Sequence, residues 1–530
     1  MPRLHRAPDG CCPSRAGRSA RTGSDDRESY HGNVSSGPFS RPATGSETPP
    51  ADAIDVLDSA DAGRATIRGS TLRVLGYGAG SLLALASAPL LVRHLGVAEF
   101  GRYATVVSLV GIVGGLTDAG LAAVAIREHA TTSGPSRERL ARNLLGIRIV
   151  LTTLGVLAAA AFAAVAGYGA PLVVGTALAG LGLLLLVVQQ TWATVLQAEL
   201  RQGWVTLAEL VRQIVVVAGI IALVVVGASL VPFLALAIPA ALAALVLTGV
   251  LVHRTIPLRP SFHLAAWRAL LRETLPVSAA VALHSVYLRV VIVLMSLVAV
   301  EIETGYFAAS FRIVEVLLAV PFLLAQVILP VFSRAARDDE ARLAYVVQRA
   351  FEVALVGGAA VTVLTVVGAP VAMAVLAGDE GAGAVDVLRV QALVVFLTCL
   401  TATWQYTLFA LRCHRALVIA NVSGLAAIVA GTLLLVPSHG AVGAAAAAAI
   451  GELVLTAVSL AALVRERPRL RPKLGTVPRV ALAAGAGLAA GLLPDVADLV
   501  RIALAGGAFA ALALALRVVP EEVAQALRPR

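Results

Sequence analysis

Two arginines lie inside long apolar segments, Arg289 in LHSVYLRVVIV and Arg312 in GYFAASFRIVEVLL. A charge within a membrane-spanning segment is expensive, and it usually faces a cavity or a partner of opposite charge. The guanidinium group is always charged, and its planar fork binds phosphate oxygens through paired hydrogen bonds. The two arginines are therefore a candidate binding site for a phosphate-bearing head group. The alternative is that Glu315 neutralises one of them in a purely structural ion pair.

Further polar residues interrupt other apolar segments. Asp118 is a candidate cavity carboxylate linked to a proton or cation, or else the partner of an arginine. His284 titrates near neutrality if it is accessible, and is otherwise a satisfied interior histidine. Gln190, Thr194 and Gln197 recur at helical spacing and form one polar face. That face either accommodates a sugar in a cavity or forms hydrogen bonds to another helix.

The composition indicates a membrane protein. Hydrophobic residues make up 58% of the chain and charged residues 14%, with a mean hydropathy of +0.86, whereas a soluble chain carries about a quarter charged residues. The net charge of +10 comes from arginines between apolar segments, which excludes a basic face for nucleic acid. The four cysteines show neither metal-site nor disulfide spacing, and no metal or cofactor is expected.

The apolar segments are long enough to cross the hydrocarbon core, which takes about 20 residues of helix. The sequence predicts about fourteen transmembrane helices. Their approximate bounds are 72–92, 103–126, 144–166, 171–196, 204–226, 230–252, 276–299, 305–332, 350–376, 386–411, 416–436, 441–464, 477–493 and 499–518.

Arginines are concentrated in alternate loops, which predicts cytoplasmic N- and C-termini under the positive-inside rule. The opposite loops, among them 301–304, 378–383 and 437–440, contain no Lys or Arg. Only the first turn, with Arg93 and Arg102, departs from this pattern. With this orientation, the helical rise places Arg289 about 15 Å and Arg312 about 10 Å below the outer ends of their helices.

A short internal repeat suggests two halves. The turn Glu99–Tyr103 (EFGRY) resembles Glu303–Tyr306 (ETGY) six segments later, and an even offset indicates a parallel repeat about an axis along the membrane normal. The tail is polar and predicted to be disordered. The predicted division is a cytoplasmic tail 1–67, a first lobe 68–252, a cytoplasmic loop 253–275, a second lobe 276–464, and a final helix pair with a cytoplasmic C-terminus over 465–530.

The stretch Leu91–Ala130 resembles the start of the polysaccharide-exporter branch of the multidrug/oligosaccharidyl-lipid/polysaccharide (MOP) flippase superfamily. Its members have an R-x-L-G-x-x-x-F-G-x-Y turn and a D-x-G-L … R-E helix. The matching residues are Arg93, Leu95, Gly96, Phe100, Gly101, Tyr103, Asp118, Gly120, Leu121, Arg127 and Glu128. The resemblance implies an all-α, MATE-like fold of two six-helix lobes with a pseudo-twofold axis, here followed by two further helices.

The resemblance also implies a function. The expected activity is export of a polyprenyl-diphosphate-linked oligosaccharide across the plasma membrane by alternating access, with Arg289 and Arg312 facing the diphosphate. The expected partners are the lipid-linked oligosaccharide and membrane lipids, with a polysaccharide polymerase and glycosyltransferases as further candidates. One alternative is a drug or cation antiporter of the same superfamily. The other, a membrane glycosyltransferase or polymerase, is disfavoured because the predicted outer loops are too short to hold a donor site, so an enzyme is not expected.

Overall fold

The computed structural model describes residues 60–118, 121, 126, 134–199, 201–253, 259–338, 340–494 and 496–518. The chain divides into two units, Met1–Arg68 and Gly69–Arg530, and the following concerns the second. The predicted disordered tail and the motif residues Gly120, Arg127 and Glu128 lie largely or wholly outside the described residues. Within those residues the regular structure is helical, and none is a strand, so the all-α class is confirmed there.

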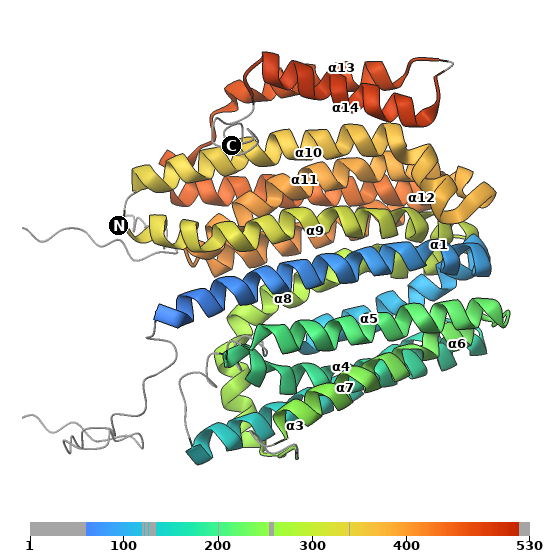
Figure 1. Ribbon diagram of the computed structural model, residues 1–530, viewed down its shortest axis with the longest axis vertical. Helices are drawn as coiled ribbons and strands as arrows, with labels where there is room; N and C mark the ends of the chain where they lie inside the picture. Colours follow the sequence, from blue (N-terminus) through green and yellow to red (C-terminus); the bar gives the residue numbers. More distant parts are fainter. Residues whose placement is uncertain are drawn as a thin grey trace, which may run out of the picture. The chain divides into compact units, whose positions relative to one another are not determined.

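The helices follow one another with short connections (Figure 1). Three of the longest, α1, α10 and α12, contain an internal proline, at Pro89, Pro370 and Pro437. The elements are α1 (Ala60–Asp118), α3 (Gly134–Val165), α4 (Ala170–Ala198), α5 (Gln202–Val225), α6 (Leu230–Ala235), α7 (Ala237–Val252), α8 (Leu264–Val298), α9 (Glu301–Asp338), α10 (Glu340–Ala377), η2 (Gly378–Ala384), α11 (Val385–Ala410), α12 (His414–Glu466), η3 (Pro468–Leu470), η4 (Leu474–Thr476), α13 (Val477–Gly491) and α14 (Asp498–Ala515).

Nine segments of the described chain are long and apolar enough to cross a membrane. Three of them, Gly78–Asp118, Glu340–Ala410 and His414–Glu466, have 41, 71 and 53 residues, where about 20 are enough for one crossing. The chain is thus a multi-pass membrane protein, as predicted. The full number of fourteen crossings stays a prediction.

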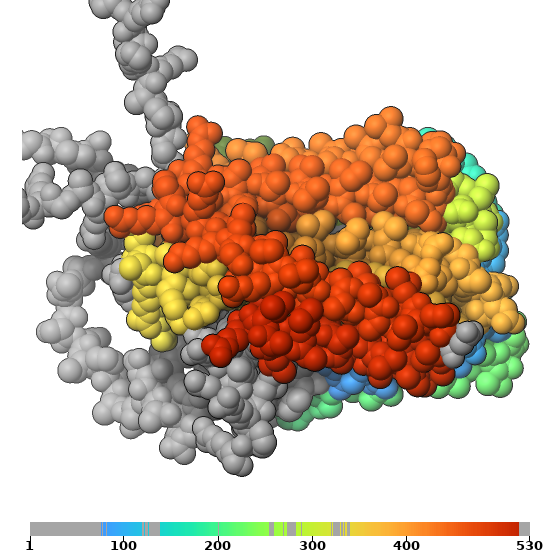
Figure 2. Space-filling view, turned by 90° about the horizontal axis from the view of Figure 1, so that it is seen from above, coloured from blue at the N-terminus to red at the C-terminus, as the bar shows by residue number. Residues whose placement is uncertain are grey.

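The helices of each half pack mainly against others of the same half. In the first half, α4 packs against α3, α6 and α7, and α5 packs against α7. In the second half, α11 packs against α9, α10 and α12, and α8 packs against α12. Figure 2 shows α13 and α14, in red, lying against each other beside α10, and their contacts agree with this view. The predicted lobe boundaries stay predictions, although these contacts are compatible with them.

Single glycines mark two of the predicted breaks between helices. The backbone of α1 stays helical through the predicted turn except at Gly96 (φ 77°, ψ 161°), and α12 stays helical except at Gly440 (φ 53°, ψ −135°). Positive φ of this kind favours glycine. The next amide in each helix is satisfied from elsewhere: Val97 N–H donates to Glu380 Oε2 at 2.9 Å, and Ala441 N–H to Glu303 Oε2 at 2.6 Å.

Two further predicted loops are shorter than expected. Helix α9 begins at Glu301, so the predicted loop 301–304 is its first turn. Helix α8 begins at Leu264, inside the predicted loop 253–275. The residues before α8 are fixed to α3, because Ser261 N–H donates to the carbonyl of Arg142 and His263 N–H to Asn143 Oδ1. This anchorage allows the helix to start early.

The two copies of the internal repeat contact each other directly. Gly101 of α1 and Gly305 of α9 approach so closely that a Cβ on Gly101 would lie 2.7 Å from the amide nitrogen of Gly305. A Cβ on Gly305 would lie 2.0 Å from the carbonyl oxygen of Val97. Beside this contact, Arg102 pairs with Glu99 at 2.5 Å and with Glu301 at 2.6 Å. Only glycine allows two helices to approach so closely. We call this contact of α1 with α9 the closed end.

An ion pair joins α1 to α3. The side chain of Arg148 is 0% exposed, and its Nη2 lies 2.6 Å from Asp118 Oδ1, while Asp118 is 41% exposed. Arg148 Nε and Nη1 have no hydrogen-bond partner within the described part of the chain. Asp118 is therefore the main group that balances the charge of the fully buried guanidinium of Arg148.

Replacing Gly305 with alanine should open the closed end, because the new methyl group collides with the backbone of α1. Overpacking of this kind costs about 1–3 kcal/mol, which raises the open population about tenfold. Thr105 is 2% exposed and lies one turn from Gly101 on the same helix face, so Thr105→Cys reports opening. In detergent, and without the native cysteines, maleimide labelling of Thr105→Cys should be about tenfold faster in Gly305→Ala.

The control for this experiment is Gly485→Ala in α13, where no neighbouring atom lies within 4 Å of the added methyl group. It should leave the labelling of Thr105→Cys unchanged. Equal labelling rates in the Gly305→Ala and Gly485→Ala backgrounds would show that the glycine contact does not keep this end closed.

Asp118→Ala should destabilise the protein strongly, because it leaves the guanidinium of Arg148 buried without a counter-charge. We expect a loss of about 3 kcal/mol, at the low end for a buried pair since Asp118 is partly exposed. The double variant Asp118→Ala/Arg148→Met should recover most of it. Asp386→Ala, which breaks the exposed pair with Arg389, should cost less than about 1 kcal/mol. Unfolding midpoints in detergent test this, and equal shifts in the two single variants would contradict it.

Candidate functional site

A cavity of about 490 Å³ lies between α1 and α5 on one side and α8 and α9 on the other. Its walls combine small residues of α1 with charged residues of the other three helices. The residues that line it are Gly76, Gly80, Ala84, Glu209, Arg212, Gln213, Arg289, Phe311, Arg312, Glu315, Val316, Leu318 and Ala319. We call it the arginine cavity. Among these residues three arginines and two glutamates give a net positive charge.

Arg289 enters the arginine cavity from α8. Its guanidinium passes so close to α1 that a Cβ on Gly111 would lie 2.5 Å from Nε. The missing side chain at Gly111 therefore makes room for Arg289. No ion pair within the described residues involves Arg289. Its charge is thus available to an anion in the cavity.

Arg312 and Glu315 line the same cavity from α9. Arg312 Nη1 lies 2.9 Å from Glu315 Oε2, and the two side chains are 39% and 33% exposed. Of the two arginines that Glu315 was expected to neutralise, the structure therefore pairs it with Arg312. A guanidinium has five donors, so this one contact leaves most of them for a ligand.

Helix α5 contributes three residues that were not predicted to belong to the site. Arg212 pairs with Glu209, with Nε at 3.0 Å from Oε2, and Gln213 is 8% exposed. Pairs of arginine and glutamate three residues apart thus face the cavity from both α5 and α9. The sequence does carry this signal, as Glu209-x-x-Arg212 and Arg312-x-x-Glu315 inside apolar segments.

The other predicted site residues lie elsewhere. Asp118 forms the ion pair with Arg148 described above, and Gln190 Oε1 lies 3.5 Å from Arg148 Nη2. Gln197 is half-buried near the end of α4. The neighbouring Gln189, which was not predicted, donates to Thr248 of α7 at 3.0 Å.

His284 lines a second cavity, of about 370 Å³, among α8, α11 and α12. Its ring stacks on that of Tyr287, with centroids 6.2 Å apart. The residues that line this second cavity are His284, Ser285, Leu329, Thr398, Thr401, Ala402, Gln405, Tyr406, Phe409, His414, Leu417, Asn421 and Glu452.

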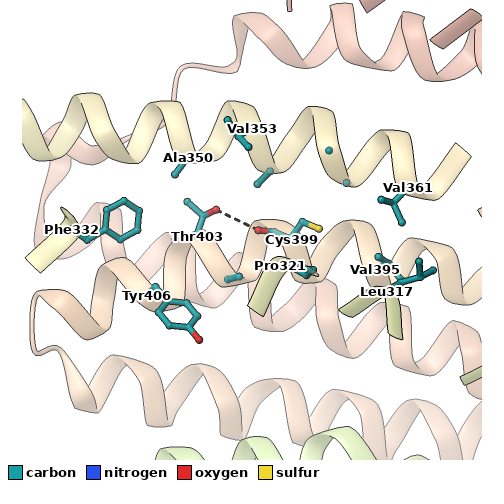
Figure 3. A pocket seen from close by; sticks show the side chains of 14 residues that line it. Leu317, Pro321, Phe332, Ala350, Val353, Val361, Val395, Cys399, Thr403 and Tyr406 are labelled. Carbon is teal, nitrogen blue, oxygen red and sulfur yellow. Dashed lines mark hydrogen bonds between the residues drawn. The ribbon is translucent and has the colours of Figure 1, made fainter. Parts of the chain in front are cut away.

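A third, apolar cavity of about 150 Å³ lies where α9, α10 and α11 meet (Figure 3). Leu317, Phe332, Val353 and Val361 are among its lining residues. The polar groups drawn there include Thr403, whose hydroxyl donates to the carbonyl of Cys399 at 3.3 Å, and Tyr406. With no charged residue in its lining, this cavity suits hydrocarbon and not a head group.

Several solved structures share this fold at low sequence identity. An inward closed structure of the lipid II flippase MurJ has 11% identity and a TM-score of 0.69, over 84% of this chain and 99% of that chain. An inward-facing MATE family multidrug resistance transporter of the MOP superfamily has 14% identity and a TM-score of 0.59, over 74% and 94%. An outward-facing MATE family structure has 16% identity and a TM-score of 0.51, over 77% and 95%.

No curated protein matches the chain at a significant level. A family model described as polysaccharide biosynthesis protein matches residues 66–336, just over half of the 530 residues. This match covers the stretch Leu91–Ala130 and confirms the resemblance that its residues indicated. The chain therefore belongs to the polysaccharide biosynthesis protein family, and it has the fold of the MurJ and MATE family structures.

Proposed function

We propose that this protein moves a polyprenyl-diphosphate-linked oligosaccharide from the cytoplasmic to the outer leaflet of the plasma membrane by alternating access. The observation that carries the proposal is the convergence of Arg212, Arg289 and Arg312 on one cavity between the two halves of the chain. The family match and the fold shared with a lipid II flippase support it.

The charges of the arginine cavity suit a diphosphate. Such a head group must cross about 30 Å of hydrocarbon, where an unshielded charge costs many kcal/mol. Arg212 and Arg312 are each held by a glutamate on their own helix, and Arg289 has no ion-pair partner among the described residues. An incoming phosphate binds Arg289 first and then competes with Glu209 and Glu315 for the other two guanidinium groups.

The same arrangement argues against a drug or cation antiporter, which is the alternative that the MATE likeness favours. A cationic substrate requires carboxylates that outnumber the cations around it. In the arginine cavity the arginines outnumber the glutamates. An anionic head group is therefore the better match.

We further propose fourteen membrane crossings with both termini in the cytoplasm. The three long apolar segments each have a natural division, at Gly96, at η2 and at Gly440. Helices α8 and α9 add one crossing each, since they have 35 and 38 residues. In this orientation the closed end faces the outside, and the arginine cavity receives its substrate from the cytoplasmic side.

Alanine at Arg289 or Arg312 should slow transfer of a fluorescent polyprenyl-diphosphate sugar in proteoliposomes. A hydrogen bond to a charged group contributes about 1.5–3 kcal/mol, so we expect a loss of at least about tenfold in each variant. The matched control is Arg389→Ala, because Arg389 pairs with Asp386 at 2.9 Å, as Arg312 does with Glu315, but lies outside the cavity.

Each variant should first be shown to fold, by its elution in size-exclusion chromatography. Unchanged transfer in Arg289→Ala and Arg312→Ala would reduce these arginines to structural residues. If the unaltered protein transferred no lipid-linked sugar but exported an organic cation against a proton gradient, the antiporter would replace the flippase.

Glu315→Gln should lower the KM for the lipid-linked sugar, because Arg312 then has no competing carboxylate. The pair is partly exposed and contributes up to about 1 kcal/mol, so a two- to fivefold decrease is expected. Initial rates at increasing substrate density in the membrane measure it. A variant without transfer would mean that the carboxylate itself takes part in the transport cycle.

A further inference from the structure

Glu452 is a buried carboxylate in the second half of α12, with a side chain that is 3% exposed. It lies where α12 packs against α8, and the hydroxyl of Tyr287 donates to its Oε2 at 2.7 Å. None of the ion pairs within the described residues involves Glu452. Its negative charge, when present, is thus balanced by hydrogen-bond donors and not by a cation.

The second cavity gives Glu452 a route to the end of the helix bundle. The cavity begins at Glu452 and extends to His414, the first residue of α12, beside the turn that follows α11. Gln405 and Asn421 offer polar groups along the way. A volume of about 370 Å³ holds several water molecules when such groups are present. Protons can therefore reach the carboxylate from that end.

Helix α8 separates this cavity from the arginine cavity. His284 and Tyr287 are three residues apart and share one face of the helix, next to Glu452. Arg289 follows Tyr287 by two residues, which turns it about 200° around the helix axis and into the arginine cavity. Tyr287, which binds Glu452, and Arg289, which faces the arginine cavity, thus lie on the same turn of α8.

A proton on Glu452 changes the hydrogen bonds of this turn. An ionised carboxylate only accepts hydrogen bonds, whereas a protonated one also donates. The groups around it that can titrate are His284 and Tyr287 of α8, Cys399 and Tyr406 of α11, and His414 of α12. Tyr287 of α8 donates to the carboxylate, and Thr398 and Thr401 of α11 form hydrogen bonds with it as well. A change in its protonation therefore acts on the contact with α8 as well as on α11.

We propose that Glu452 is the proton-binding site that drives transport, taking up and releasing one proton in each cycle. Protonation alters the contact with Tyr287 and shifts α8, and thereby moves Arg289 in the arginine cavity. The part of this proposal that concerns driving transport depends on the proposed flippase function. Proton binding at Glu452 does not, and it can be measured without any substrate.

The first experiment measures proton binding alone. The full-length protein in proteoliposomes, adsorbed on a solid-supported membrane, receives a pH jump in the absence of lipid-linked sugar. The unaltered protein should give a transient charge displacement that Glu452→Gln reduces by at least about fivefold. The matched control is Glu352→Gln, a half-buried carboxylate of α10 that pairs with Arg349 outside the second cavity, and it should keep the signal. An unchanged signal in Glu452→Gln would overturn the proposal.

The second experiment measures coupling. A pH gradient should accelerate transfer of the fluorescent polyprenyl-diphosphate sugar by the unaltered protein, and Glu452→Gln should transfer at one rate with or without the gradient. Transfer by the unaltered protein that ignores pH, or follows a sodium gradient instead, would overturn proton coupling and leave the flippase function standing. A pH-jump signal without any sugar transfer would overturn the flippase function and leave the proton site standing.

Tyr287→Phe keeps the proposal testable if Glu452→Gln does not fold. The ionised carboxylate then loses one of its hydroxyl donors, so the midpoint of the pH-jump signal should move by about one unit toward higher pH. An unmoved midpoint in a folded Tyr287→Phe protein would contradict the role of Tyr287, and a lost response at all pH values would contradict Glu452 as the proton acceptor.

Discussion

The backbone contact of Gly101 with Gly305 is the constraint from which the arrangement of α1 and α9 follows. Two helices approach this closely only where neither has a side chain. The two glutamates that satisfy the amides after Gly96 and Gly440 lie at the same end of the bundle, in η2 and in the first turn of α9. The charged residues of α9 that line the cavity lie about two to three turns beyond Gly305, so the arginine cavity opens below the contact.

Local pairing explains how the arginines of this cavity are kept in an apolar environment. Arg212 and Arg312 each have a glutamate three residues away on the same helix, so their partners do not depend on how the two halves of the chain are placed. Arg289 instead depends on space left by Gly111. A site of this kind keeps its charges compensated while helices move, which a transporter with alternating access requires.

The sequence predicted the helical class, the superfamily and the convergence of Arg289 and Arg312, because apolar length, a local motif and helical rise are local properties. It placed breaks around Gly96 and Gly440, but it did not predict that a single glycine forms each break, since the carboxylates that satisfy the next amides lie 283 and 138 residues away. Arg212 was not predicted to belong to the site. Glu452 is also a charge inside a predicted apolar segment, 441–464, but its contact with Tyr287, 165 residues distant, could not be predicted.

The pair of Asp118 and Arg148 has a consequence for how the chain enters the membrane. An arginine in an inserting helix costs up to about 2.5–3.5 kcal/mol, the value at the helix centre, and here the guanidinium ends fully enclosed. Its counter-charge is 30 residues earlier, on the preceding long helix. The ribosome thus delivers the acidic residue before the basic one, and α1 must wait beside the translocation channel until α3 arrives. We therefore expect α1 and α3 to leave the translocation channel as a pair at this step, and not one helix at a time.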